Sequence, residues 1–148
     1  MHILVISGPN LNLLGRREPH IYGAVTLDQI HAQLQDEATA LDCTVDCFQS
    51  NHEGALLDFL QANMDRAQGA LLNPGGLTQH SVSLHDAIKS MPFPVIEVHL
   101  SNIHARDPWR SHSIIASAAR GQVAGLGWLS YLTALRGLVA LLRDQAAS

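Results

Sequence analysis

The chain has 148 residues and a formal net charge of −4, a size that fits one domain able to fold without disulfides or a structural metal. It holds one lysine and eight arginines, so no basic stripe exists to neutralise the phosphates of a nucleic acid. No apolar run is long enough to span a bilayer, which excludes a membrane-spanning role.

Short apolar runs alternate with segments of helical periodicity along the whole chain. In chain order, the predicted elements are a strand at 3–6, a helix at 27–41, a strand at 44–48, a helix at 53–67, a strand at 70–72, a helix at 80–90, strands at 95–98 and 122–126, and a helix at 128–143. Strands that alternate with helices indicate a parallel sheet covered on both faces. We therefore expect one flavodoxin-like α/β domain over residues 1–148, with three layers and a five-stranded parallel sheet.

The last predicted helix, 128–143, is apolar on nearly all of its surface. A surface helix normally has a polar face, so this helix is buried either by a partner subunit or deep within its own domain. We favour the partner, because a small domain has little room to bury a whole helix.

The segment 8–23 follows the first strand and is unusually long for a loop in a compact domain. Such loops are usually functional or disordered, and this one carries Arg16, Arg17 and Tyr22 between glycines and prolines, unlike a disordered tail. In open α/β sheets, ligands bind outside the carboxyl ends of the strands. The loop therefore offers guanidinium groups to a small anion, and Arg17 is placed to stabilise Tyr22 as a tyrosinate.

Three other strand ends carry polar segments, at 49–54, 73–78 and 97–104. In a parallel sheet these segments meet the first loop at one edge. That edge collects amides, a histidine, a phenol and guanidinium groups, from Asn10, Arg17, Tyr22, Asn73, His99, Ser101, Arg106 and Arg110. Glu97 and His99 face the same side of one strand, where a carboxylate fixes the tautomer of an imidazole and raises its basicity. Considered without its loops, such a pair is as often structural as catalytic.

Several cofactor sites lack their sequence motifs. Neither a phosphate loop nor a Gly-x-Gly-x-x-Gly run follows the first strand, and no His-Glu-x-x-His motif or zinc-spaced cysteine pair occurs. We expect no metal and no cofactor. The two cysteines, Cys43 and Cys47, would lie about 13 Å apart in an extended chain, too far to bridge. Unpaired thiols are typical of a reducing compartment, so we expect a cytoplasmic protein.

The motifs at 8–23, 49–54, 73–75 and 97–106 together resemble those of type II 3-dehydroquinate dehydratase, and the resemblance extends from the first strand through Gly127. It implies a flavodoxin-like fold and a cofactor-free dehydration of the small molecule 3-dehydroquinate in the shikimate pathway. It also implies a homododecamer built as four trimers.

The resemblance further implies a role for each matching residue. Tyr22 would be the general base, His99 the general acid with Glu97 as its partner, and Arg17 the activator of Tyr22. Asn10 would hold a water near the enolate. The residues that would contact the substrate are Asn73, Gln79, Leu100, Ser101, Arg106 and Arg110, together with Asp86, which would reach into a neighbouring subunit's site.

The chain departs from the family pattern at Gln79, where the family has a substrate-binding histidine. Either the Gln79 amide donates the same hydrogen bond, or the neighbouring His80 moves into the site. Asp107-Pro108-Trp109 and Ser111 also differ from the usual lid. One alternative is therefore a small-anion-binding protein on the same fold that has lost turnover through Gln79. A weaker one is a nucleotide- or flavin-binding module.

Overall fold

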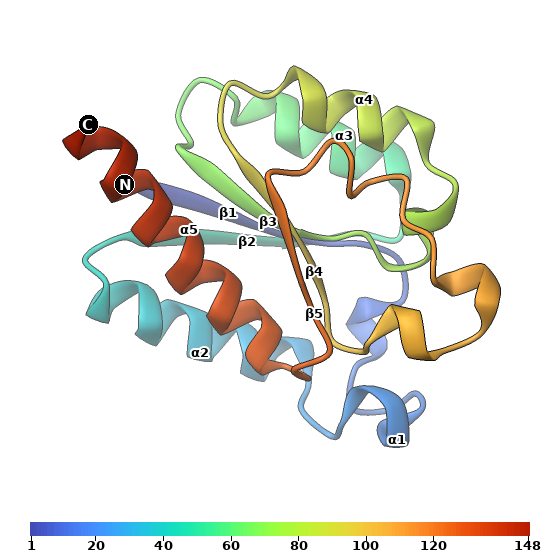
Figure 1. The fold of residues 1–148 in the computed structure, drawn as a ribbon. Helices are drawn as coiled ribbons and strands as arrows, with labels where there is room; N and C mark the ends of the chain where they lie inside the picture. Colours follow the sequence, from blue (N-terminus) through green and yellow to red (C-terminus); the bar gives the residue numbers. More distant parts are fainter.

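Five strands form the parallel sheet at the centre of the computed structural model, which describes residues 1–148 (Figure 1). They are β1 (His2–Ser7), β2 (Thr44–Gln49), β3 (Gly69–Asn73), β4 (Val95–His99) and β5 (Gly121–Ala124). Neighbouring strands follow the order β2-β1-β3-β4-β5, and every pair is parallel. This is the order of the flavodoxin-like fold, so the predicted fold class is confirmed.

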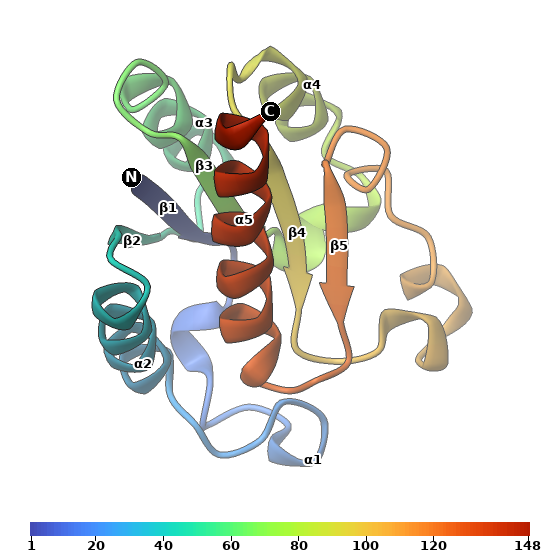
Figure 2. The same cartoon turned by 60° about the vertical axis from the view of Figure 1, so that its left-hand side comes forward.

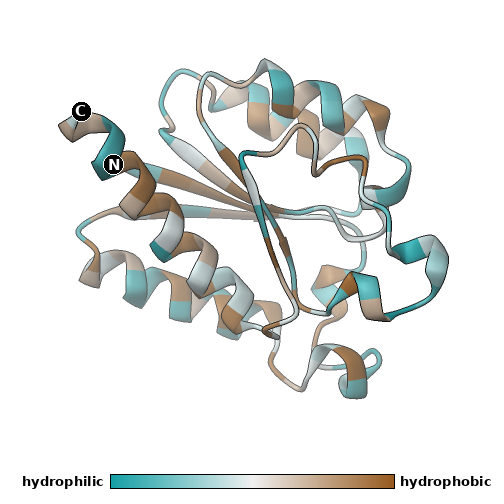
Figure 3. Cartoon of the chain, in the orientation of Figure 1, coloured by the Kyte–Doolittle hydropathy of each residue, from teal (hydrophilic) through white to brown (hydrophobic).

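Helices cover both faces of the sheet, two on each side (Figures 1 and 2). One layer consists of α2 (Leu27–Ala40) and α5 (Leu129–Ala147), and the other of α3 (Glu53–Ala62) and α4 (Val82–Ser90). Successive residues of β1 point to opposite faces, so Val5 packs with the first layer and Ile6 with the second. Figure 3 shows the apolar colour concentrated on the strands and on the helix sides that face them.

The predicted start of the first long helix is confirmed by its cap. The Thr26 hydroxyl accepts a hydrogen bond from the Gln29 backbone at 3.2 Å, and the Gln29 side chain accepts one from the Thr26 backbone at 2.9 Å. This reciprocal capping box satisfies two backbone donors that a helix start would leave unpaired. It ends the long segment after β1 and begins α2 at Leu27.

Segment 8–23 is not a plain loop, because it contains two short helical turns. A 3₁₀ turn, η1, spans Leu11–Leu13, and α1 spans Pro19–Tyr22. Each turn is preceded by a residue with left-handed backbone, Asn10 at φ 69° and Glu18 at φ 40°. These reversals fold the segment back over the carboxyl end of the sheet.

Several predicted boundaries were wrong, among them the end of the last helix, which was predicted at 143 and lies at Ala147. The helix predicted at 53–67 ends at Ala62, after which Asn63 donates a side-chain hydrogen bond of 2.8 Å back to the Phe59 carbonyl. The helix predicted from residue 80 begins at Val82, because Ser81 caps it. The strand predicted at 122–126 lies at Gly121–Ala124, since Gly125 turns the chain with a φ of +90°.

Of the two alternatives for the last helix, burial within its own domain is the one observed, because α5 packs its apolar side into the core; the favoured partner is not needed to cover that side. Its buried residues are Ser130, Tyr131, Leu132, Ala134, Leu135, Leu138 and Val139. The outward side carries mostly polar or small residues such as Thr133, Arg136 and Ala140, and Arg136 pairs with Glu37 of α2 at 2.6 Å. None of the helices has the length and hydropathy needed to cross a bilayer.

Candidate active site

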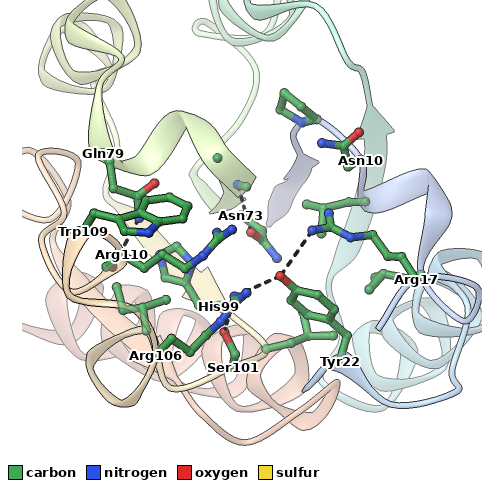
Figure 4. Close-up of a pocket in the computed structure, with 17 residues that line it drawn as sticks. Asn10, Arg17, Tyr22, Asn73, Gln79, His99, Ser101, Arg106, Trp109 and Arg110 are labelled. Atoms are coloured by element: carbon green, nitrogen blue, oxygen red, sulfur yellow. Dashed lines mark hydrogen bonds between the residues drawn. The ribbon is translucent and has the colours of Figure 1, made fainter. Parts of the chain in front are cut away.

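A pocket at the carboxyl ends of β1, β3 and β4 gathers most of the predicted site residues (Figure 4). Its lining includes Asn10, Arg17, Tyr22, Asn73, Gln79, His99, Leu100, Ser101, Arg106 and Arg110. Two predicted site residues do not line it. Glu97 lies behind His99 in the core, and Asp86 lies on α4 with its side chain exposed.

The first loop is held close to the loop after β3. A Cβ at Gly8 would lie 2.6 Å from the Pro74 carbonyl oxygen, and a Cβ at Gly75 would lie 2.8 Å from the Pro9 oxygen. A side chain at either position would clash with the backbone of the other loop, so each position requires glycine. The Asn10 backbone amide also donates a 2.9 Å hydrogen bond to Asn51 from the end of β2. The polar strand ends therefore converge as the sequence predicted.

The Tyr22 hydroxyl accepts hydrogen bonds from two arginines. Arg106 Nη1 lies 2.9 Å from the phenolic oxygen and Arg17 Nη2 lies 3.5 Å from it. Both guanidinium carbons also lie near the ring, 4.9 Å from its centre for Arg17 and 5.3 Å for Arg106. Two cationic donors on one oxygen form an environment suited to an anion. Arg106, predicted as a substrate contact, thus makes the closer contact with the phenol.

The side chains of His99 and Glu97 lie in contact and are both buried. His99 Nε2 lies 3.3 Å from Glu97 Oε2, without the alignment of a good hydrogen bond. Glu97 is fully buried and also accepts hydrogen bonds from Ser113, at 2.6 Å, and from the Gln122 amide. Burial acts to raise the pKa of Glu97, but His99 and these two donors outweigh it and hold that pKa below its usual value.

The Asn73 side chain is fixed by a residue that the sequence analysis missed. Its amide nitrogen donates to the Tyr131 hydroxyl at 3.2 Å, and its oxygen accepts from the Gly75 backbone at 3.2 Å. Tyr131 is fully buried on α5 and also contacts Ser7 at 2.9 Å. Burial raises the pKa of Tyr131 to about 12, so its phenol stays neutral. The available signal was a tyrosine in an apolar helix, because its hydroxyl needs a hydrogen-bond partner when the ring is buried.

Gln79 lines the pocket, whereas the neighbouring His80 does not. The Gln79 amide donates a 3.2 Å hydrogen bond to the Arg110 carbonyl oxygen. The Arg110 guanidinium lies 4.0 Å from the centre of the Trp109 ring, which is 61% exposed at the rim. Through this hydrogen bond, Gln79 connects the turn that follows β3 to the segment that carries Trp109 and Arg110.

No group of three His, Cys, Asp or Glu side chains comes together as a metal site would require. Asp86 pairs with the adjacent His85 at 3.1 Å on α4. Its place in the site of a neighbouring subunit stays a prediction.

Comparison with known proteins gives matches over nearly the whole chain. The family model described as Dehydroquinase class II matches residues 1–139. A protein of Roseiflexus castenholzii named 3-dehydroquinate dehydratase is 54% identical over 152 residues, which cover 99% of this chain and 97% of the relative. The type II dehydroquinase of Butyrivibrio crossotus superposes with a TM-score of 0.91 at 38% identity, over 93% of this chain and 97% of that one. The Propionibacterium acnes enzyme gives 0.91 at 37%, over 94% and 96%.

Proposed function

Because this chain belongs to the class II dehydroquinase family, we propose that it is a 3-dehydroquinate dehydratase, a hydro-lyase that converts 3-dehydroquinate into 3-dehydroshikimate and water. The observation that supports this most is the pairing of Tyr22, under two guanidinium groups, with a carboxylate-bound His99 in one pocket. This pair can supply both proton transfers that the reaction needs.

The substrate is a cyclic 3-keto carboxylate with a hydroxyl group β to the ketone. Its ketone acidifies the proton on C2, so the Tyr22 tyrosinate removes it and leaves an enolate. The His99 imidazolium then gives a proton to the departing hydroxyl, which leaves as water. Base and acid act on opposite faces, in an anti elimination. Neither step needs a cofactor or a Schiff base.

The remaining residues of the pocket bind and polarise the substrate. Arg17 and Arg106 hold the anionic form of Tyr22, and Asn10 holds a water beside the enolate oxygen, where negative charge develops. The substrate hydroxyls and carboxylate are bound by Asn73, Gln79, Arg110 and the backbone at Leu100 and Ser101, all of which line the pocket.

The active form is a trimer-based assembly, with a dodecamer as its full size, in which Asp86 completes a neighbour's site. The exposure of the Asp86 side chain, 71%, leaves it available for such a contact. The enzyme works in the cytoplasm, where Cys43 and Cys47 stay reduced. Both are free thiols, and burial raises the pKa of Cys47 to about 12, which makes it unreactive.

Ultraviolet absorbance tests the activity directly. The product is a conjugated enone carboxylate, so absorbance should rise when the protein is mixed with 3-dehydroquinate. No rise at high protein concentration would contradict the enzyme assignment. A calorimetric binding signal without this rise would indicate the binding protein instead, and a yellow purified protein would indicate flavin.

A further inference from the structure

Two neutral side chains hold the carboxylate behind the proposed general acid. The Ser113 hydroxyl donates to Glu97 Oε1 at 2.6 Å, and the Gln122 amide donates to Oε2, the oxygen that also faces His99. Glu97 is fully buried, so its carboxylate has no surface open to bulk solvent. Its two oxygens therefore depend on these three side chains.

The register of β4 and β5 brings the Gln122 side chain to the Glu97 carboxylate. Glu97 of β4 is paired with Gln122 of β5 on one side and with apolar Leu72 of β3 on the other. Paired residues of neighbouring strands point to the same face, so the Gln122 amide meets the Glu97 carboxylate across the ladder. Besides these two donors, the side chain that contacts the Glu97 carboxylate is His99.

Ser113 comes from a different direction. It follows the segment that carries Arg106, Trp109 and Arg110. Its hydroxyl accepts from the Ala116 backbone at 3.1 Å while donating to Glu97. The next residue, Ile114, is anchored by a backbone hydrogen bond of 3.1 Å to Thr78. Ser113, the donor to Oε1, is therefore held by the contact of its hydroxyl with Ala116 and by the backbone hydrogen bond of its neighbour Ile114.

The charge of His99 changes during the proposed reaction. The imidazolium gives its proton to the leaving hydroxyl, which departs as water, and becomes neutral. Tyr22 has meanwhile taken a proton from C2, and return of that proton to His99 through solvent restores both groups. While His99 is neutral, Glu97 is a buried anion without a cation, a state that is costly unless other donors satisfy it.

We propose that Ser113 and Gln122 are positioning residues, which keep the Glu97 carboxylate ionised and in place while His99 loses and regains its proton. The inference rests on the proposed role of His99 as general acid. Without these donors the buried Glu97 carboxylate would take up a proton more readily, and a proton on Glu97 would sit on the wrong member of the pair. Neither residue lines the pocket.

Kinetics of Ser113→Ala and Gln122→Leu test the proposal. Each change should lower kcat by about tenfold, the value of a hydrogen bond to a charged group, with KM within twofold. In the profile of kcat against pH, the acid-side fall should shift to a pH about one unit higher. Ser113→Thr, which keeps the hydroxyl, should restore kcat. Gln61→Leu on α3, a matched change at an exposed position, should alter neither quantity.

A double-variant comparison separates positioning from a general loss of structure. In a Glu97→Gln background, adding Gln122→Leu should cause no further loss of kcat, because the carboxylate that it serves is gone. An equal loss in both backgrounds, or an unshifted acid-side fall in both single variants, would overturn the proposal. Ser113→Ala tests the other oxygen independently if Gln122→Leu folds poorly.

Infrared titration without substrate separates this proposal from the proposed function. The band of protonated Glu97, identified by its absence in Glu97→Gln, should appear at higher pH in Gln122→Leu than in the unaltered protein. If the band shifts but the protein does not dehydrate 3-dehydroquinate, the proposed dehydratase activity is rejected and the role of Gln122 in holding the Glu97 carboxylate is kept. If the protein is active but the band does not shift, the role of Gln122 is rejected and the dehydratase activity is kept.

Discussion

Arg106 and Tyr22, 84 positions apart in the chain, are joined by a hydrogen bond of 2.9 Å from the guanidinium to the phenolic oxygen. Arg17, from the same loop as Tyr22, reaches that oxygen at 3.5 Å. The phenolic oxygen therefore accepts a hydrogen bond from one guanidinium group of each of two segments that line the pocket (Figure 4). The contacts of the phenolic oxygen therefore depend on how both segments are placed.

Removing the phenolic oxygen should separate binding from chemistry. Tyr22→Phe should abolish turnover of 3-dehydroquinate, because no other group in its position can take the C2 proton. Binding should persist, since Asn73 and Arg110 are unchanged, and calorimetry with the inactive variant measures it. A kcat near that of the unaltered enzyme would show that another group is the base.

Arg17→Ala and Arg106→Ala should each lower kcat at neutral pH by about 10- to 100-fold, the range for a hydrogen bond to a charged group. The loss should shrink as pH rises, because the phenol then ionises without the missing cation. Arg66→Ala is the matched control, since Arg66 pairs with Asp46 outside the pocket. A loss that stays constant across the pH range would remove this role from the arginine concerned.

Gln79→His restores the side chain that the family carries at this position. The Gln79 amide already lies in the pocket and hydrogen-bonds to the Arg110 carbonyl. We expect kcat/KM to change less than tenfold, or by under about 1.4 kcal/mol, because either side chain can donate to a substrate hydroxyl. A much larger gain in steady-state assays would identify Gln79 as a weakening substitution.

Glu97 should make the stability of the fold depend on pH. The pKa of its carboxyl is lowered in the folded chain from an ordinary value of 4.5, so its stabilising contribution is complete above that value. The contribution is lost as pH falls through the lower, folded-state value. In urea unfolding, Glu97→Gln should flatten the acid side of the stability profile, whereas Asp58→Asn on the exposed face of α3 should not. Parallel profiles for Glu97→Gln and the unaltered protein would contradict this linkage.

Asp86→Ala should lower activity without unfolding the subunit, because the proposed site is completed by a neighbour. Circular dichroism checks the fold, and light scattering should find at least a trimer in the unaltered protein. Asp58→Ala, another exposed acid on a helix, should leave activity unchanged. A fully active monomer at assay concentration would exclude the shared site.

The sequence by itself determined the strands, the fold class and most of the pocket. Alternating apolar runs placed β1 and β3 in a parallel sheet, and Thr26 marked the start of α2. Because the carboxyl ends of parallel strands meet at one edge, the polar strand ends had to converge. The motifs at that edge are long enough to indicate the family by themselves.

Only the tertiary structure decided which side chains support the site. The contacts of Arg106 with Tyr22, of Tyr131 with Asn73 and of Gln122 with Glu97 join residues that are far apart in sequence. Strand order and register set these contacts, and a linear pattern does not encode them. The burial of α5 has the same origin, because a helix that looks apolar all round can still turn its few polar and small residues outward.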